Sequence, residues 1–286
     1  MSALAARLSA LRAQAGAVVA ERLEPAFVAA TDASISPIPE QLRRLLGIRV
    51  RTQAKLLALD RSLPGCEIAD GLRLVERDYP WHEMPLDLNA QFAGLGRIAR
   101  ENLVYFDTET TGLSGGTGTR AFMIGAADWY GGCLRVRQLL TTTMAGEEAM
   151  LREFSTWLRP QSTLVSYNGK SYDAPLLATR YRLNRISNPL AGLAHLDLLY
   201  PVRRRFRGVW QNCRLSTVER EWLGVVRDDD LPGSEAPGAW RDYLRGLSAR
   251  NLRRVGEHND QDLRSLATLL LKLGETDALC LQGEIR

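Results

Sequence analysis

Residues 104–113 read Val-Tyr-Phe-Asp-Thr-Glu-Thr-Thr-Gly-Leu, and this stretch decides the fold and the chemistry expected of the chain. An apolar, β-prone run ends in two carboxylates, Asp107 and Glu109, and Gly112 then breaks the strand. Successive side chains of a strand alternate faces, so these two carboxylates are expected to point the same way. Carboxylates held this close repel each other, and a divalent cation such as Mg²⁺ relieves the repulsion with oxygen ligands. An isolated Asp-x-Glu is more often a solvated turn, so the remaining segments must support the metal site.

The composition is that of a globular protein and excludes several other classes. The chain has 286 residues, of which 45% are hydrophobic and 24% charged, and its net charge of +4 allows a polyanionic partner without requiring one. The four cysteines are isolated, which excludes a disulfide framework and zinc-ligand spacing. We find no signal-peptide pattern and no apolar stretch of the ~20 residues that span a bilayer. We therefore expect a cytoplasmic protein with no membrane association.

The pattern of apolar residues changes near residue 97, where we place a domain boundary. Residues 1–96 are expected to form an N-terminal extension, with a helix at 2–24, a linker at 25–38 and a strand and turn at 71–81. Residues 97–275 are expected to form one α/β domain, followed by a tail at 276–286. Within the domain we predict strands at 103–106, 120–129, 134–140 and 163–167, and helices at 147–158, 172–183 and 259–273. Three antiparallel strands followed by α/β units predict a mixed sheet flanked by helices.

Two later segments carry further acidic residues. The segment Ser166-Tyr167-Asn168-Gly169-Lys170-Ser171-Tyr172-Asp173 leaves a strand, turns on Asn-Gly and places Asp173 at the start of a helix. The segment His258-Asn259-Asp260-Gln261-Asp262 lies at the start of the last helix, where residues four apart share a face. Taken alone, Asp173 is most often a helix N-cap, and a histidine with an aspartate four residues on is commonly a surface pair.

Together, in their order and separation, these segments resemble the motifs of the DEDD exonucleases, a superfamily with the ribonuclease H-like fold. The first motif is 106–113, the second 167–173 and the third 258–262. More narrowly, the chain is similar to the YprB-type ribonuclease H-like proteins. That similarity is carried by His195-Leu196-Asp197-Leu198-Leu199, by Arg214-Leu215-Ser216-Thr217-Val218-Glu219 and by Asp228-Asp229-Asp230-Leu231-Pro232-Gly233-Ser234-Glu235-Ala236-Pro237. The resemblance covers about residues 70–273 and implies a ribonuclease H-like mixed sheet of antiparallel hairpin strands and parallel strands.

The resemblance also implies a function, that of a metal-dependent 3′-to-5′ exonuclease acting on single-stranded DNA or RNA. It implies two divalent ions, Mg²⁺ or Mn²⁺, as cofactors. Their ligands would be Asp107, Glu109, Asp173 and Asp262. His258 would orient or deprotonate the attacking water, a role suited to its ordinary pKa near 6.5. Its position departs from the pattern of the family, because relatives with a histidine usually place it five residues before the last aspartate and relatives with a spacing of four usually carry a tyrosine.

A further set of residues is assigned to contact with nucleic acid. Leu113 is expected to wedge against the terminal base, and Asn168 to fix the second motif near the substrate. The densest basic run contains Arg203, Arg204, Arg205 and Phe206. Arginines beside an aromatic ring can hold phosphates and stack a base, although a solvated helix face is nearly as common an explanation.

Two other functions are compatible with the same motifs. The chain could be a nucleic-acid-binding module that kept the fold and lost turnover, or an endonuclease on the same fold. The complete acidic set argues against the first, because four converging carboxylates without metal would repel a polyanion. Dependence on a substrate end would separate the second from an exonuclease. Outside the acidic set, we expect His195 to be a structural hydrogen-bonding residue and Asp197 to cap a helix.

Overall fold

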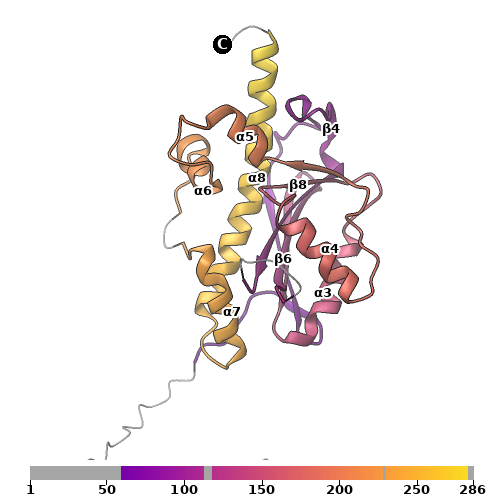
Figure 1. The fold of residues 1–286 in the computed structure, drawn as a ribbon, viewed down its shortest axis with the longest axis vertical. Helices are drawn as coiled ribbons and strands as arrows, with labels where there is room; N and C mark the ends of the chain where they lie inside the picture. Colours follow the sequence, from indigo (N-terminus) through magenta and orange to yellow (C-terminus); the bar gives the residue numbers. More distant parts are fainter. Residues whose placement is uncertain (1–58, 113–117, 228–229, 283–286) are drawn as a thin grey trace, which may run out of the picture. The chain divides into compact units, whose positions relative to one another are not determined.

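The computed structural model describes residues 59–112, 118–227 and 230–282. The predicted helix at 2–24 and the linker at 25–38 lie outside the described residues. The described ranges belong to one compact unit. They contain a seven-stranded sheet in the order β1-β2-β7-β6-β5-β8-β9, with helices on both faces (Figure 1). The predicted mixed sheet is confirmed.

Five neighbouring strands form the antiparallel part of this sheet. Its strands are β1 (Cys66–Ala69), β2 (Leu72–Pro80), β7 (Cys133–Thr141), β6 (Ala121–Tyr130) and β5 (Leu103–Thr110). The turn between β6 and β7 uses Gly131 and Gly132 at φ 58° and 81°, angles that favour glycine. Strands β1 and β2 come from the predicted N-terminal extension, yet β2 pairs with β7 over its whole length. The sheet therefore extends into residues that precede the predicted boundary at 97.

The parallel part of the sheet brings three strand ends to one edge. β8 (Thr163–Ser166) pairs in parallel with β5, and β9 (Ala194–Asp197) pairs in parallel with β8. Helix α3 (Glu147–Thr156) lies between β7 and β8 in the chain, and α4 (Asp173–Leu183) lies between β8 and β9. Because parallel strands share one direction, the C-terminal ends of β5, β8 and β9 lie side by side. The segments that follow these strands therefore leave the sheet at the same place.

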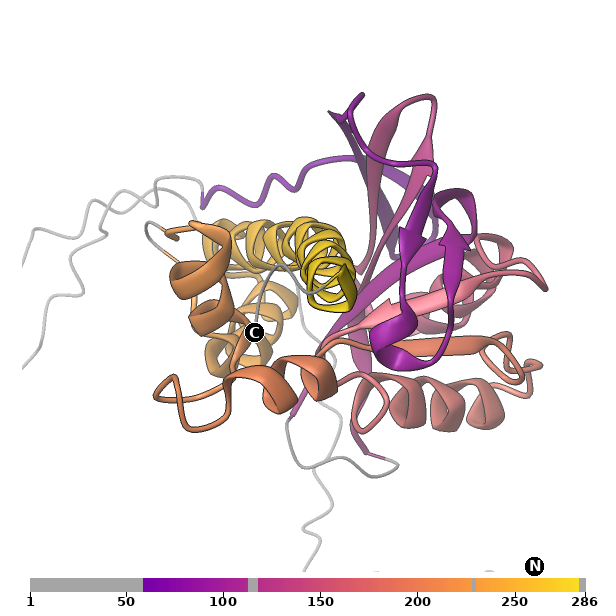
Figure 2. The same ribbon diagram turned by 90° about the horizontal axis from the view of Figure 1, so that it is seen from above.

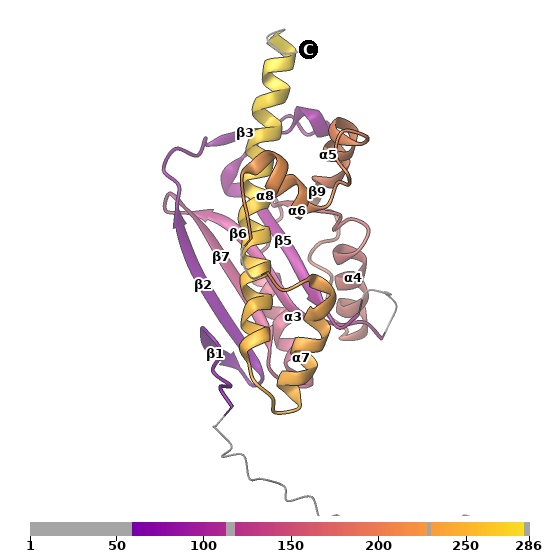
Figure 3. The same cartoon turned by 90° about the vertical axis from the view of Figure 1, so that its left-hand side faces the viewer.

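The side chains of β5 alternate between two hydrophobic layers. Val104 and Phe106 pack in a cluster with buried residues of α3 and α4. Leu103 and Tyr105 pack on the opposite face in a cluster with α8 (Arg250–Gln282). Figures 2 and 3 show α8 lying across one face of the sheet, with α3 and α4 on the other. Helix α8 starts before the predicted 259–273 and continues past residue 275.

The remaining elements surround α8 and the edge of the sheet. They include α5 (Leu199–Phe206), α6 (Leu215–Val218), a π-helical turn at Glu219–Leu223, α7 (Ala236–Leu244), and the small sheet of β3 (Asp87–Asn89) and β4 (Arg97–Ala99). A 3₁₀ turn at Gln91–Ala93 connects β3 to β4. Each helix in the described ranges is too short or too polar to cross a membrane.

Candidate active site

The first motif lies on β5, at the edge where the parallel strands end. Asp107 and Glu109 continue the series of Leu103 and Tyr105, whose side chains face α8. Glu109 is buried, with 8% of its surface exposed, and Asp107 is partly buried. The strand therefore holds two carboxylates against the long helix, where little water reaches them.

The second motif is a turn that is fixed by backbone hydrogen bonds. Asn168 has a left-handed φ of 67°. Its N–H donates to Asp197 Oδ1 at 2.7 Å, and the N–H of Lys170 donates to Asp197 Oδ2 at 3.0 Å. Asp173 begins α4 and accepts a hydrogen bond from the Thr108 hydroxyl on β5. The turn is thus tied to β9 at one end and to β5 at the other.

The third motif lies on the face of α8 that covers β5. His258 and Asp262 are one turn apart, with His258 Nε2 3.7 Å from Asp262 Oδ2. Between them, the fully buried Asn259 donates from Nδ2 to Asp107 Oδ2 at 2.9 Å. Its Oδ1 accepts from Gln138 Nε2, also at 2.9 Å. Asn259 therefore fixes the register of the helix against the first motif.

The acids of the three motifs lie close enough together for the charge of one to change the pKa of another. Burial raises the pKa of Asp107 well above its ordinary value, and the charges of Asp262, Asp173 and Glu109 raise it further. Burial also raises the pKa of Glu109, with added repulsion from Asp262 and Asp173. Burial raises the pKa of Asp173 to about 6, against the hydrogen bond from Thr108. The site thus has an excess of negative charge that a cation would stabilise.

The donor set fits a hard divalent cation in its chemistry, because carboxylate oxygens are the ligands that Mg²⁺ and Mn²⁺ take. Its side chains lie farther apart than the ligands of a bound metal ion do. Within the described ranges, no three acid, histidine or cysteine side chains converge closely enough to hold an ion. The residues with the chemistry to contribute are the four predicted ligands, Asp107, Glu109, Asp173 and Asp262.

An arginine that the sequence did not point to sits beside these acids. Arg227 hydrogen-bonds to Asp262 and to both carboxylate oxygens of Glu219, at 2.5 and 2.7 Å. Glu219 is only 1% exposed and also accepts from the Ser265 hydroxyl. Burial lowers the pKa of Arg227, but the hydrogen bond and charge of Glu219 and Asp262 outweigh it and keep the guanidinium charged. One fixed cation therefore already balances part of the acidic site.

A second acid missed by the sequence is Asp230, whose Oδ1 lies 2.7 Å from His258 Nδ1. Its charge also raises the pKa of Glu109. Glu219 and Asp230 belong to the two segments 214–219 and 228–237 that carry the narrower resemblance. Their position in those segments was the available signal, but only the three-dimensional contacts reveal their roles.

The other predicted site residues lie in different surroundings. Leu113 is outside the described residues. Arg203, Arg204 and Arg205 are exposed on α5. Phe206 is partly buried and stacks on Trp210, with the ring centroids 3.8 Å apart. Trp210 covers one face of this ring, and the contacts of Phe206 with a base and of the three arginines with phosphates stay predictions.

His195 and Asp197 support the second motif from β9. His195 Nε2 lies 2.8 Å from the Ser166 hydroxyl, and burial lowers the pKa of the ring to about 4, so the ring is neutral at pH 7. This agrees with a structural hydrogen-bonding role. Asp197 accepts from the Leu199 N–H at 3.1 Å, as a residue at a helix start does, and it also binds the second-motif turn. The prediction of a helix cap was therefore incomplete.

Three comparisons show which known proteins the chain is similar to. The chain is 37% identical over 177 residues to a protein named "Uncharacterized protein YprB" from Bacillus subtilis (strain 168). The alignment covers 62% of this chain and 43% of that protein, so this chain spans less than half the length of that relative. The family B DNA polymerase of Pyrobaculum calidifontis has 17% identity and a TM-score of 0.45, over 62% of this chain and 24% of the polymerase.

A crystal structure of E. coli exonuclease I in complex with a dT13 oligonucleotide has 14% identity and a TM-score of 0.36. That similarity covers 52% of this chain and 42% of the enzyme. The family match is stronger, because the model of the RNase H superfamily matches residues 104–273, more than half of the chain. The chain belongs to the RNase H superfamily.

Proposed function

We propose that the protein is a metal-dependent nuclease that removes nucleotides from the 3′ end of single-stranded DNA or RNA. The observation that carries this proposal is that acids from β5, α4 and α8 lie close enough together for their charges to raise the pKa values of Asp107 and Glu109. Each of Asp107, Glu109 and Asp173 has a pKa raised above its ordinary value, foremost by burial. Membership of the RNase H superfamily supports hydrolysis of a phosphodiester as the chemistry.

In this proposal, Asp107, Glu109, Asp173 and Asp262 hold two divalent ions. Bound ions of this kind act as Lewis acids, which makes water acidic enough to attack near neutral pH and stabilises charge on the leaving oxygen. The protein contributes the placement of these ligands. Asn259 orients Asp107 by the hydrogen bond from Nδ2, and Thr108 orients Asp173.

His258 is the proposed base for the attacking water. His258 Nδ1 lies 2.7 Å from Asp230 Oδ1 and 3.0 Å from Arg227 Nη1. In the proposed tautomer Nδ1 donates to Asp230 and the lone pair is on Nε2. Nε2 is the nitrogen that faces Asp262, at 3.7 Å, so it is the atom directed at the acidic site. Asp230 would act on the reaction through His258, as a positioning residue.

One observation favours a second candidate, a nucleic-acid-binding module without turnover. The guanidinium of Arg227 hydrogen-bonds to Asp262, which gives one predicted metal ligand a cationic partner from the protein itself. If Arg227 keeps this place when nucleic acid is bound, Asp262 has less capacity for a metal ion. The same assay separates the two candidates.

The experiment is degradation of 5′-labelled single-stranded DNA and RNA by the full chain with Mg²⁺, Mn²⁺ or EDTA. Asp107→Asn is the test variant. Asp78→Asn is the matched control, because Asp78 is an exposed residue of β2 outside the acidic site. The proposal predicts a metal-dependent ladder that shortens from the 3′ end with wild type and control and is absent with Asp107→Asn.

The other results would each contradict the proposal. Internal cuts that persist on a circular substrate would identify an endonuclease. Binding of the oligonucleotides without cleavage, under either metal, would identify the binding module.

A further inference from the structure

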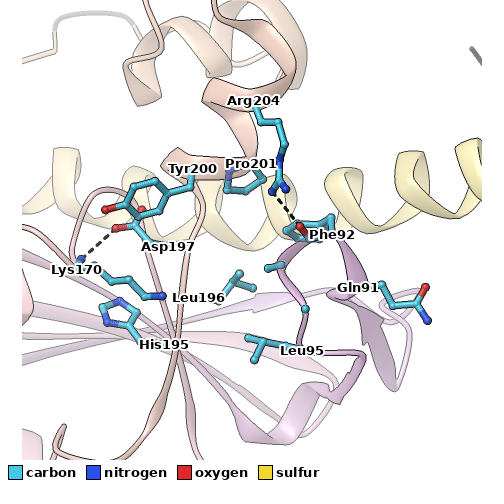
Figure 4. A pocket seen from close by; sticks show the side chains of 12 residues that line it. Gln91, Phe92, Leu95, Lys170, His195, Leu196, Asp197, Tyr200, Pro201 and Arg204 are labelled. Carbon is cyan, nitrogen blue, oxygen red and sulfur yellow. Dashed lines mark hydrogen bonds between the residues drawn. The ribbon is translucent and has the colours of Figure 1, made fainter.

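A pocket of about 500 Å³ lies on the outer side of the edge strand β9. Its walls are the 3₁₀ turn after β3, the strand β9, the second-motif turn and the start of α5 (Figure 4). None of the four proposed metal ligands lines it. The side chains that give the pocket its chemistry are Phe92, Leu95, Lys170, His195, Tyr200 and Arg204.

The charges around this pocket favour an anion. Lys170 and Arg204 reach into it from opposite sides, as Figure 4 shows. Lys170 is exposed, and within the described residues only its backbone N–H, not its side-chain Nζ, has a hydrogen-bond partner. Arg204 uses one Nη2 donor on the Phe92 carbonyl oxygen at 2.9 Å, which holds the guanidinium at the pocket with other N–H donors to spare. The charge of Asp197 is already engaged by three backbone N–H groups.

The apolar part of the lining suits the face of a base. Tyr200 is 48% exposed and Leu95 is 39% exposed, while Phe92 is partly buried. Aromatic side chains left open to solvent beside basic groups are what single-stranded nucleic acids stack on. A pocket of this size with one open aromatic ring and two cations fits a nucleotide better than it fits a purely apolar ligand.

The pocket is continuous with the second motif of the acidic site. Lys170 and Asp173 belong to the same turn, and the Tyr200 hydroxyl lies 3.4 Å from the Ser171 hydroxyl. Tyr172, which directly precedes Asp173, is 62% exposed. Two exposed aromatic residues, Tyr172 and Tyr200, therefore belong to or adjoin the turn that positions a proposed metal ligand.

We propose that this pocket binds one nucleotide of a single strand whose 3′ end lies at the acidic site. Lys170 and Arg204 would contact its phosphate, and Tyr200 and Phe92 its base. The inference rests on the proposed function, because the acidic site defines where the end of the strand lies. A free nucleoside monophosphate has the same recognition chemistry, and the test distinguishes the two sources.

The test is fluorescence anisotropy with 5′-labelled thymidine and uridine oligonucleotides of two to twelve nucleotides, in Mg²⁺. The full chain carries Asp107→Asn to prevent degradation. Onto it are placed Lys170→Gln, Arg204→Gln or Tyr200→Leu, and Arg152→Gln as the control. Arg152 is an exposed residue of α3 that pairs with Glu148, away from the pocket. Competition with unlabelled nucleoside monophosphate is measured on the same proteins.

We expect Tyr200→Leu to weaken binding of the longer oligonucleotides about fivefold or more, which corresponds to the loss of one stacked base. Lys170→Gln and Arg204→Gln together should lower the salt dependence of log K by about 0.7, because the pocket then neutralises one phosphate fewer. Each single variant should lower it by part of that amount. Binding of dinucleotides should change little, and Arg152→Gln should bind as the parent does.

If the pocket variants bind oligonucleotides of every length as tightly as the parent does, the proposed nucleotide site is wrong, while the proposed function still stands. Loss of affinity for the monophosphate, with the oligonucleotides unaffected, would show that the site takes a free nucleotide and would overturn the strand assignment. If the parent binds no oligonucleotide and wild type degrades none, the proposed function itself fails.

Discussion

Substitution of Gly125 by alanine tests how α8 is held against the first motif. Gly125 lies on β6 opposite Asp107. A Cβ atom built there would be 2.0 Å from Oδ1 of Asn259 and 2.8 Å from its Cγ, distances that real Cβ contacts do not show. Asn259 is fully buried in the helix, so it cannot turn away into solvent. The glycine is therefore required by the close approach of the asparagine.

The cost follows from the interactions that the new methyl group would disrupt. Overpacking of a buried position costs about 1–3 kcal/mol. Displacement of Asn259 also breaks its hydrogen bonds to Asp107 and Gln138, and each such bond contributes roughly 0.5–1.5 kcal/mol. Together these contributions lead us to expect that Gly125→Ala lowers the free energy of unfolding by about 2–6 kcal/mol, measured by urea denaturation. Metal-dependent cleavage should fall as well, because Asp107 loses the donor that orients it.

A double-mutant cycle makes the argument specific. Asn259→Ala removes the atoms that the new methyl group would strike, so Gly125→Ala should cost less than about 1 kcal/mol in that background. Adding Asn259→Ala to Gly125→Ala should therefore restore part of the free energy of unfolding. Cleavage should stay low, because Asp107 still lacks its hydrogen-bond donor. The reasoning is refuted if Gly125→Ala costs as much with Asn259→Ala as it does in the wild type.

Two further predictions concern the charges of the site. Arg227→Ala should lower the free energy of unfolding by about 3–5 kcal/mol, because it leaves the buried Glu219 without its cationic partner. Urea denaturation should show partial recovery on adding Glu219→Gln, and no recovery would contradict this account. In EDTA, the raised pKa of Asp173 makes the folded state bind more protons than the unfolded state between its ordinary 3.8 and about 6, so stability should fall as pH rises through that window. The thermal midpoint of wild type should therefore fall relative to Asp173→Asn, and a relative rise would contradict the prediction.

The elements that local sequence determines were predictable. β5, the β6–β7 hairpin, α3 and α4 follow from apolar periodicity, from the two turn glycines and from residues that start helices. Strand β9 was not predicted, because its four residues have too little pattern and depend on pairing with β8. The start of α8 at Arg250 was also missed, since the predicted start followed the third motif at His258.

The candidate site likewise contains residues that the sequence predicts and contacts that it does not. The acids of the three motifs could be named from the sequence because the motifs have fixed residue types at fixed separations. The close approach of Asn259 to Gly125 and the pairing of Arg227 with Glu219 could not, because they join residues whose closeness depends on how α8 packs on the sheet. A buried hydrogen-bond network of this kind leaves no periodic signal in the chain.

The most direct test of the central claim is titration of the full metal-free chain with Mn²⁺ at pH 7.5 by calorimetry. If the acids of β5, α4 and α8 form a metal site, wild type and Asp78→Asn will bind Mn²⁺ alike. Asp107→Asn and Asp262→Asn will each bind it at least about tenfold more weakly, since each removes a charged ligand from an already repulsive cluster. Equal Mn²⁺ binding by all four proteins would contradict the account.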